Sequence, residues 1–116
     1  MKVAFVSGPY RAKTKLGILI NILKARKVAK GLWKMGYMVV CPHLNSALMD
    51  GIVPDEVFLR CDLMLLKQCD VVVIMKGWRK SKGTLGEIAC AKDNNIPVVP
   101  WCATGMIGWF ANGENV

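Results

Sequence analysis

The sequence predicts one α/β domain, with a parallel sheet of four to five strands covered by helices on both faces. Apolar strand-like segments alternate with segments of helical periodicity, in the order β-α-β-α-β-α-β. Such alternation is typical of parallel strands joined by helical crossovers. The segments 38–41 and 71–75 are wholly apolar, as expected for strands that helices cover on both sides. No linker or repeat divides the 116 residues, so a single domain over 1–116 is expected.

The first half of the chain begins with a predicted strand over 2–7, which Gly8-Pro9 ends. A helix is predicted over 16–35, and Gly36 ends it. Its apolar residues recur at helical spacing and are expected to face the core: Ile18, Ile22, Ala25, Ala29, Leu32 and Trp33. A second strand over 37–41 and a loop over 42–53 follow.

In the second half, Pro54 and Asp55 open a helix that runs to about residue 68. A buried strand over 70–75 leads into a cationic, glycine-containing loop over 76–83. The last predicted elements are a helix over 84–93 and a strand over 96–99. The complete pattern predicts a doubly wound, flavodoxin- or Rossmann-like domain, whose ligands bind at the carboxyl ends of the strands.

The charge is strongly basic and unevenly distributed. The net charge is +8, nine Lys or Arg residues lie between Lys2 and Lys34, and no acidic residue precedes Asp50. A basic surface of this kind favours solubility or an anionic partner, either a phosphate-bearing small molecule or nucleic acid. Nucleic acid is the less favoured partner, because the only aromatic residue among the helix lysines, Trp33, is expected to face the core.

Cysteine and histidine usage predicts a cytoplasmic protein without a metal centre. The five cysteines are odd in number, form no C-x-x-C motif and lie in apolar sequence, which favours buried free thiols in a reducing compartment. The single histidine, His43, excludes a His-rich metal site, and no cofactor is expected. The uncharged stretch 94–113 contains Pro97, Pro100, Gly105 and Gly108, which argues against a membrane span.

Two acidic residues are candidates for chemistry. Glu87 lies one turn inside the helix that follows the cationic loop, although Thr84-Leu85-Gly86-Glu87 also fits a capping box. Gly86 is a poor helix former, which favours the close approach of another group. Asp62 lies on or beside the apolar stripe of the second helix, unless this helix is rotated so that Asp62 faces water. A buried carboxylate at either position needs a partner or a shifted pKa.

Polar residues that follow the other strands are expected at the same edge of the sheet. Tyr10 and Arg11 follow the first strand, and His43 and Asn45 follow the second. Each has an ordinary alternative as a turn, loop or structural residue. In the third loop, Ser81 and the neighbouring lysines suit a phosphate, through hydroxyl, backbone N–H and charge. The loop matches neither G-x-x-x-x-G-K-[ST] nor G-x-G-x-x-G, so a dinucleotide fingerprint is absent.

Three motifs occur in a fixed order: G-P-Y at 8–10, D-L-x-x-L-x-x-C-D-V-V-V at 62–73 and S-K-G-T-L-G-E at 81–87. In this set the chain resembles the nucleoside 2-deoxyribosyltransferase-like superfamily, and it is especially similar to small members common in phages and bacteria. The resemblance covers residues 1 to about 100. It implies a doubly wound fold and cleavage of the N-glycosidic bond of nucleosides or nucleotides, with no metal or cofactor.

The resemblance also implies roles for individual residues. Glu87 is expected to attack the anomeric carbon, Asp62 to protonate the departing base or position groups around it, and Tyr10 to orient the nucleophile. Transferases that act on free nucleosides carry D-x-G-T-x-x-E, and here Ser81 replaces the aspartate. This serine matches the branch that hydrolyses deoxynucleoside 5′-monophosphates. The residues expected to contact substrate are therefore Gly8, Arg11, His43, Asn45, Ser81, Gly83 and Thr84.

Two other functions stay open at this point, a nucleotide-binding protein without turnover and a nucleic-acid-binding module. Members of the superfamily are dimers or larger, so a homodimer or higher homo-oligomer is expected. The apolar tail is a candidate interface or a part of the core, with Trp101, Met106, Ile107, Trp109 and Phe110. Asn112 and Asn115 are candidates to reach a neighbouring subunit's site.

Overall fold

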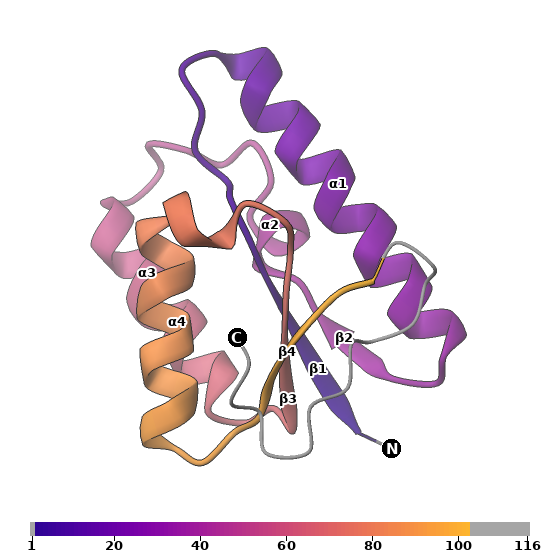
Figure 1. The fold of residues 1–116 in the computed structure, drawn as a ribbon. Coiled ribbons are helices and arrows are strands. Elements are labelled where there is room, and N and C mark those ends of the chain that lie inside the picture. The colour runs from indigo at the N-terminus through magenta and orange to yellow at the C-terminus, as the bar shows by residue number, and fades with distance from the viewer. Residues whose placement is uncertain (1, 103–116) are drawn as a thin grey trace.

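The computed structural model describes residues 2–102, which form a parallel sheet between two layers of helices. The strands are β1 (Val3–Ser7), β2 (Met38–Val40), β3 (Val71–Ile74) and β4 (Val98–Pro100). The helices are α1 (Lys15–Lys34), α2 (Pro42–Asn45), α3 (Asp55–Leu66) and α4 (Lys82–Asp93), with a short 3₁₀ turn η1 (Trp78–Lys80) between β3 and α4. Figure 1 shows α1 on one side of the sheet and α3 and α4 together on the other. The predicted fold class is confirmed.

All strand pairs are parallel, and the spatial order is β2-β1-β3-β4. The chain winds outward from β1 to β2 and then returns across β1 to reach β3. The direction of winding therefore reverses between β1 and β3. In sheets of this kind, ligands bind outside the carboxyl ends of the two strands between which the winding reverses.

Side-chain alternation along the strands divides the core into two clusters. Ala4 and Val6 of β1 pack toward α1, together with Val73 and Val99 of the neighbouring strands. Phe5, between them in the sequence, packs on the opposite face with residues of α3 and α4. The central strands are thus covered on both faces, as predicted. β2 is an edge strand, and Met38 is exposed, so the expectation of full cover does not hold there.

The structure corrects several predicted boundaries. Residues 42–45 of the expected loop form α2, because Pro42 at the first helical position fixes a suitable φ and loses no needed N–H. α4 begins at Lys82, two residues before the predicted start. Trp33 does not face the core, since 53% of it is exposed and Ala25, Ala29 and Leu32 occupy the buried side of α1.

Candidate active site

A buried serine–glutamate pair lies at the carboxyl end of β1. Ser7 is the last residue of β1, and its Oγ donates a hydrogen bond of 2.5 Å to Oε1 of Glu87 on α4. Only 1% of Ser7 and 8% of Glu87 are exposed. The pair joins residues 80 positions apart in the sequence, and it fixes the glutamate beside the strand end. Sequence reasoning missed Ser7; the one available signal was a polar residue at the carboxyl end of an otherwise apolar strand.

The start of α4 explains why Glu87 is buried. Ser81, not Thr84, is the N-cap, and its Oγ accepts a hydrogen bond of 3.2 Å from the backbone N–H of Thr84. The capping-box interpretation of Thr84 and Glu87 is therefore wrong. With the cap three residues earlier, Glu87 lies one turn further into the helix and its carboxylate accepts the hydrogen bond from Ser7.

Thr84 lies one turn before Glu87 on α4 and is 1% exposed. Its Oγ1 is buried and has no hydrogen-bond partner among the described residues. A buried hydroxyl without a partner is costly, and in native proteins such a group is often explained by a bound water or ion or by a catalytic role. Residues three apart share one helix face, so this hydroxyl and the glutamate belong to the same side of α4.

Both candidate carboxyl groups have raised pKa values. Burial raises the pKa of Glu87 to about 7, the hydrogen bond from Ser7 lowers it, and the charge of Asp62 raises it further. Burial also raises the pKa of Asp62, on α3, to about 6. Asp62 is half-buried, so it is neither enclosed in the core nor fully exposed to water. The structure thus brings together two carboxyl groups that both exchange protons near neutral pH.

Cys41, which directly follows β2, is a further buried group near the glutamate. Burial raises the pKa of its thiol to about 11, and the charge of Glu87 contributes to this rise. The thiol is therefore protonated at neutral pH and is a weak nucleophile.

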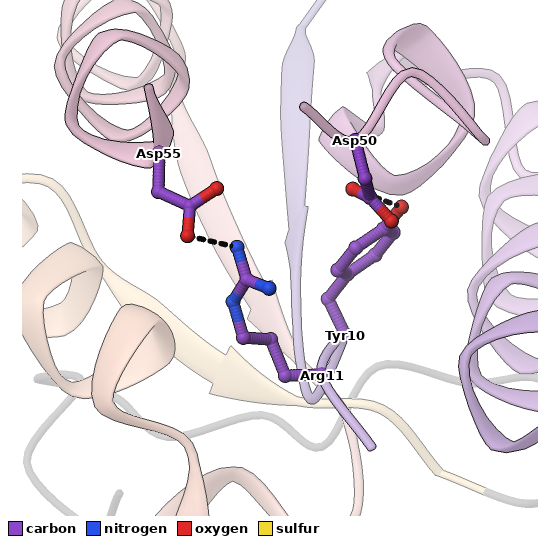
Figure 2. Close-up of polar contacts among 4 residues, drawn as sticks. All are labelled: Tyr10, Arg11, Asp50 and Asp55. Atoms are coloured by element: carbon purple, nitrogen blue, oxygen red, sulfur yellow. Dashed lines mark hydrogen bonds and ion pairs between the residues drawn. The ribbon is translucent and has the colours of Figure 1, made fainter. Parts of the chain in front are cut away.

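Tyr10 lies in the loop that follows β1, where its side chain contacts polar groups. Its hydroxyl donates a hydrogen bond of 3.1 Å to Oδ1 of Asp50, as Figure 2 shows. Burial and Asp50 raise the pKa of the phenol, which keeps this donor protonated. The expected role of Tyr10, orienting Glu87, stays a prediction, because the recorded hydrogen bond of its hydroxyl goes to Asp50.

His43, on α2, packs edge-on against Tyr10, with ring centroids 5.4 Å apart. It is buried, and its Nε2 lies 2.8 Å from the carbonyl oxygen of Pro9. A carbonyl only accepts, so Nε2 carries the proton. Burial lowers the pKa of the ring, which keeps it neutral near pH 7. His43 therefore supports the β1–α1 loop. Asn21 on α1 supports the same loop, because its side-chain amide donates a hydrogen bond of 3.0 Å to the backbone carbonyl of Tyr10. Sequence reasoning missed Asn21.

Arg11 forms an ion pair with Asp55 at the start of α3, and both side chains are largely exposed (Figure 2). It is the only ion pair among the described residues. It links the β1–α1 loop to α3, the helix that carries Asp62. An exposed pair of this kind is worth little in stability, so Arg11 remains free to exchange partners. Asn45 is exposed at the end of α2.

Glycines shape the loops around the glutamate. A Cβ on Gly8 would lie 2.6 Å from Sδ of Met75, so only glycine lets the end of β1 pass that close to β3. A Cβ on Gly83 would meet only ordinary contacts, and one on Gly86 would meet nothing within 4 Å. The close approach expected at Gly86 is therefore absent from the described part of the chain.

The loop before α4 is cationic and precedes free backbone donors. Arg79 stacks on Trp78 with its guanidinium carbon 4.5 Å from the ring centroid, and Lys80 and Lys82 are exposed on either side of Ser81. The first N–H groups of a helix attract anions. Within residues 2–102, no group of three His, Cys, Asp or Glu side chains is placed to hold a metal ion.

Three further predictions concern a membrane span, the C-terminal tail and the oligomeric state. No helix within it is both long and apolar enough to cross a bilayer. The tail residues Met106, Ile107, Trp109, Phe110, Asn112 and Asn115 lie outside the described residues. The expected homo-oligomer stays a prediction, which light scattering of the purified protein checks.

The chain belongs to the family described as "Domain of unknown function (DUF4406)", which matches residues 5–100. No curated protein matches the sequence at a significant level.

Several solved structures share the fold. One is a 2-deoxyribosyltransferase from Bacillus psychrosaccharolyticus, with a TM-score of 0.61 and 18% identity over 84% of this chain and 70% of that one. The solution structure of BlsM gives 0.66 and 21% identity over 90% of this chain and 66% of that one. A conserved protein from Enterococcus faecalis V583 gives 0.61 and 19% identity over 86% of this chain and 62% of that one. The resemblance to the deoxyribosyltransferase fold is thus confirmed, on a chain that spans about two thirds of these relatives.

Proposed function

We propose that this member of the DUF4406 family cleaves the N-glycosidic bond of a nucleoside 5′-monophosphate, with Glu87 as the nucleophile and water as the usual acceptor. The observation that carries the proposal is the buried Glu87, which Ser7 holds at the carboxyl end of β1 and whose pKa the charge of Asp62 raises. Both carboxyl groups change protonation near neutral pH, so the form with Glu87 ionised and Asp62 protonated is present as a minor species. In that form one group can attack carbon while the other gives a proton. The shared fold with a 2-deoxyribosyltransferase supports the same reaction class.

In the first step, the ionised Glu87 attacks the anomeric carbon. The bond between this carbon and the base nitrogen breaks, its electron pair leaves with the base, and Asp62 gives the base a proton. A glycosyl ester of Glu87 results. In the second step, the ionised Asp62 takes a proton from water, the water oxygen bonds to the anomeric carbon, and Glu87 is released. The products are a free base and a sugar phosphate.

The phosphate has a place at the start of α4. Ser81 uses an Oγ lone pair to cap the helix, which leaves its hydroxyl proton free to donate to a phosphate oxygen. The N–H groups of the first turn and the exposed Lys80 and Lys82 add donors and positive charge. Thr84, whose buried hydroxyl has no partner within residues 2–102, is proposed to bond the sugar phosphate one turn before the nucleophile.

The test is base release from a panel of ribo- and deoxynucleoside 5′-monophosphates, compared with the matching nucleosides and resolved by chromatography. Release by wild type and not by Glu87→Gln, with monophosphates preferred, is the expected result. Lys92→Gln is a matched control, since it removes an exposed cation at the far end of α4. Equal or greater activity on unphosphorylated nucleosides would contradict the phosphate site. Tight binding without release would favour a nucleotide-sequestering protein.

A further inference from the structure

The solvent-exposed side of α1 is apolar in the first half of the helix and cationic in the second half. Leu16, Leu19, Ile20 and Leu23 are exposed in its first half. The same helical row continues with cations in the second half, because residues three, four and seven apart share one face: Lys27, Lys30 and Lys34. α1 contains no acidic residue, and none of its cations forms an ion pair in the described chain. Their mutual repulsion is therefore not relieved within the described residues.

These cations surround a groove of about 490 Å³. Arg26, Lys27, Lys30 and Lys34 line it together with Gly31, two apolar side chains and Trp101. The groove belongs to the side of the sheet that α1 covers, whereas Glu87 and Asp62 lie on α4 and α3, on the opposite side (Figure 1). It is a separate feature from the candidate active site.

Trp101 forms a fixed aromatic surface in this groove. Its backbone N–H donates a hydrogen bond of 3.0 Å to the carbonyl of Ile74, directly after β4, and its side chain is partly exposed. The indole lies directly against α1, because a Cβ on Gly31 would come within 2.5 Å of its Cη2 atom. Gly31 thus admits the ring between the cations. The sequence-based reason for disfavouring nucleic acid, the lack of an aromatic residue near the lysines, does not hold.

We propose that this groove binds the backbone of a single-stranded nucleic acid, with one base stacked on Trp101. Four cations match a run of phosphates, and a fixed aromatic ring beside them matches the exposed face of an unpaired base. A duplex is the poorer fit, because its bases are stacked inside. An anionic membrane is also the poorer fit, because Trp101 is tied to β3 within a concave surface and cannot insert.

The test measures fluorescence anisotropy of a labelled oligothymidylate of about ten nucleotides with the full chain. Four neutralised phosphates on a single strand give a slope of about −2.8 in log affinity against log salt, a loss of roughly 50-fold between 50 and 200 mM. The double variant Lys27→Gln/Lys30→Gln is expected to reduce this slope by about 1.4. The matched control Lys67→Gln/Lys92→Gln removes the same charge from exposed positions on α3 and α4 and is expected to keep the slope.

Stacking is tested separately. Trp101→Ala is expected to weaken the oligonucleotide about 5- to 150-fold and to leave an abasic strand of equal length unaffected. Trp101→Phe keeps an aromatic ring and covers the case in which the alanine variant does not fold. Equal losses in the groove and control double variants would reduce the effect to net charge and overturn the proposal. Absence of oligonucleotide binding, stronger binding of the duplex, or binding only to phosphatidylserine vesicles would overturn it as well.

Discussion

Removal of the Ser7 hydroxyl gives the sharpest test of the proposed nucleophile. The Ser7→Ala variant loses the hydrogen bond to Oε1 of Glu87 and changes little else, since Ser7 is buried and alanine fits its space. This bond favours the ionised glutamate, so its loss raises the pKa of Glu87 above the present value of about 7. The attacking group must be ionised, so the variant is expected to be slower than wild type at neutral pH and to approach the wild-type rate as the pH rises.

The size of the effect follows from the hydrogen bond. A bond to a charged group contributes about 1.5 to 3 kcal/mol, or roughly one to two pKa units. The pKa of Glu87 in the variant is then roughly 8 to 9. At pH 7 about half of the wild-type glutamate is ionised, against about 1 to 10% in the variant. The ratio of wild-type to variant kcat/KM is therefore about 5 to 50 at pH 7 and about 1 to 2 at pH 9.

This ratio is a clean measure because it removes the contribution of Asp62. The protonation state of Asp62 shapes both pH profiles alike, so it cancels when the two rates are divided. The assay is initial-rate base release from the best monophosphate between pH 5 and 9, with circular dichroism at each pH to confirm folding. A ratio that stays constant across this range would refute the reasoning, because a purely structural defect does not recover with ionisation of Glu87.

Three further results are expected. Asp62→Asn removes the proposed proton donor, so base release falls at every pH and its profile loses the decline on the alkaline side. The raised pKa of Glu87 makes folding stability greatest below pH 4.5 and lowers it as the pH rises through about 7, by roughly 3 kcal/mol. Urea unfolding of Glu87→Gln shows this pH dependence reduced. Gly8→Ala lowers the unfolding free energy by about 1 to 3 kcal/mol, while the control Gly86→Ala, in open space on α4, raises it by about 0.5 to 1.

The fold could be predicted from the sequence because hydrophobic periodicity and residue composition indicate the same secondary structure along most of the chain. The run 71–74 is apolar and β-branched, and it became β3 at the centre of the sheet. α2 was not readable, because four residues give no period and only Pro42 marks a start. Helical spacing alone predicts that Trp33 faces the core. In the structure, smaller side chains fill the buried side of α1, and Trp33 lies just outside it.

The carboxyl groups of the candidate site could be predicted from the sequence, but the residues around them could not. Glu87 and Asp62 stand out in the sequence because both interrupt apolar helical faces. Ser7 acquires its role only when the sheet brings β1 beside β3, and no local pattern reports a contact across 80 positions. The capping role of Ser81 was missed, because the S/T-x-x-E pattern points to Thr84. Which of the two residues caps the helix decides whether Glu87 belongs to a capping box or lies buried one turn further on.

The sheet that builds the active site also separates it from the groove on α1, and this separation has a measurable consequence. Sites that share no partners contribute independently, so their effects in a double variant are expected to add. Glu87→Gln is expected to abolish base release and to leave oligonucleotide affinity within about twofold of wild type. Lys27→Gln/Lys30→Gln is expected to do the reverse. If the groove variant also lowers kcat/KM for monophosphates, the two surfaces act on one ligand, and the nucleotide substrate would then be the end of a longer strand.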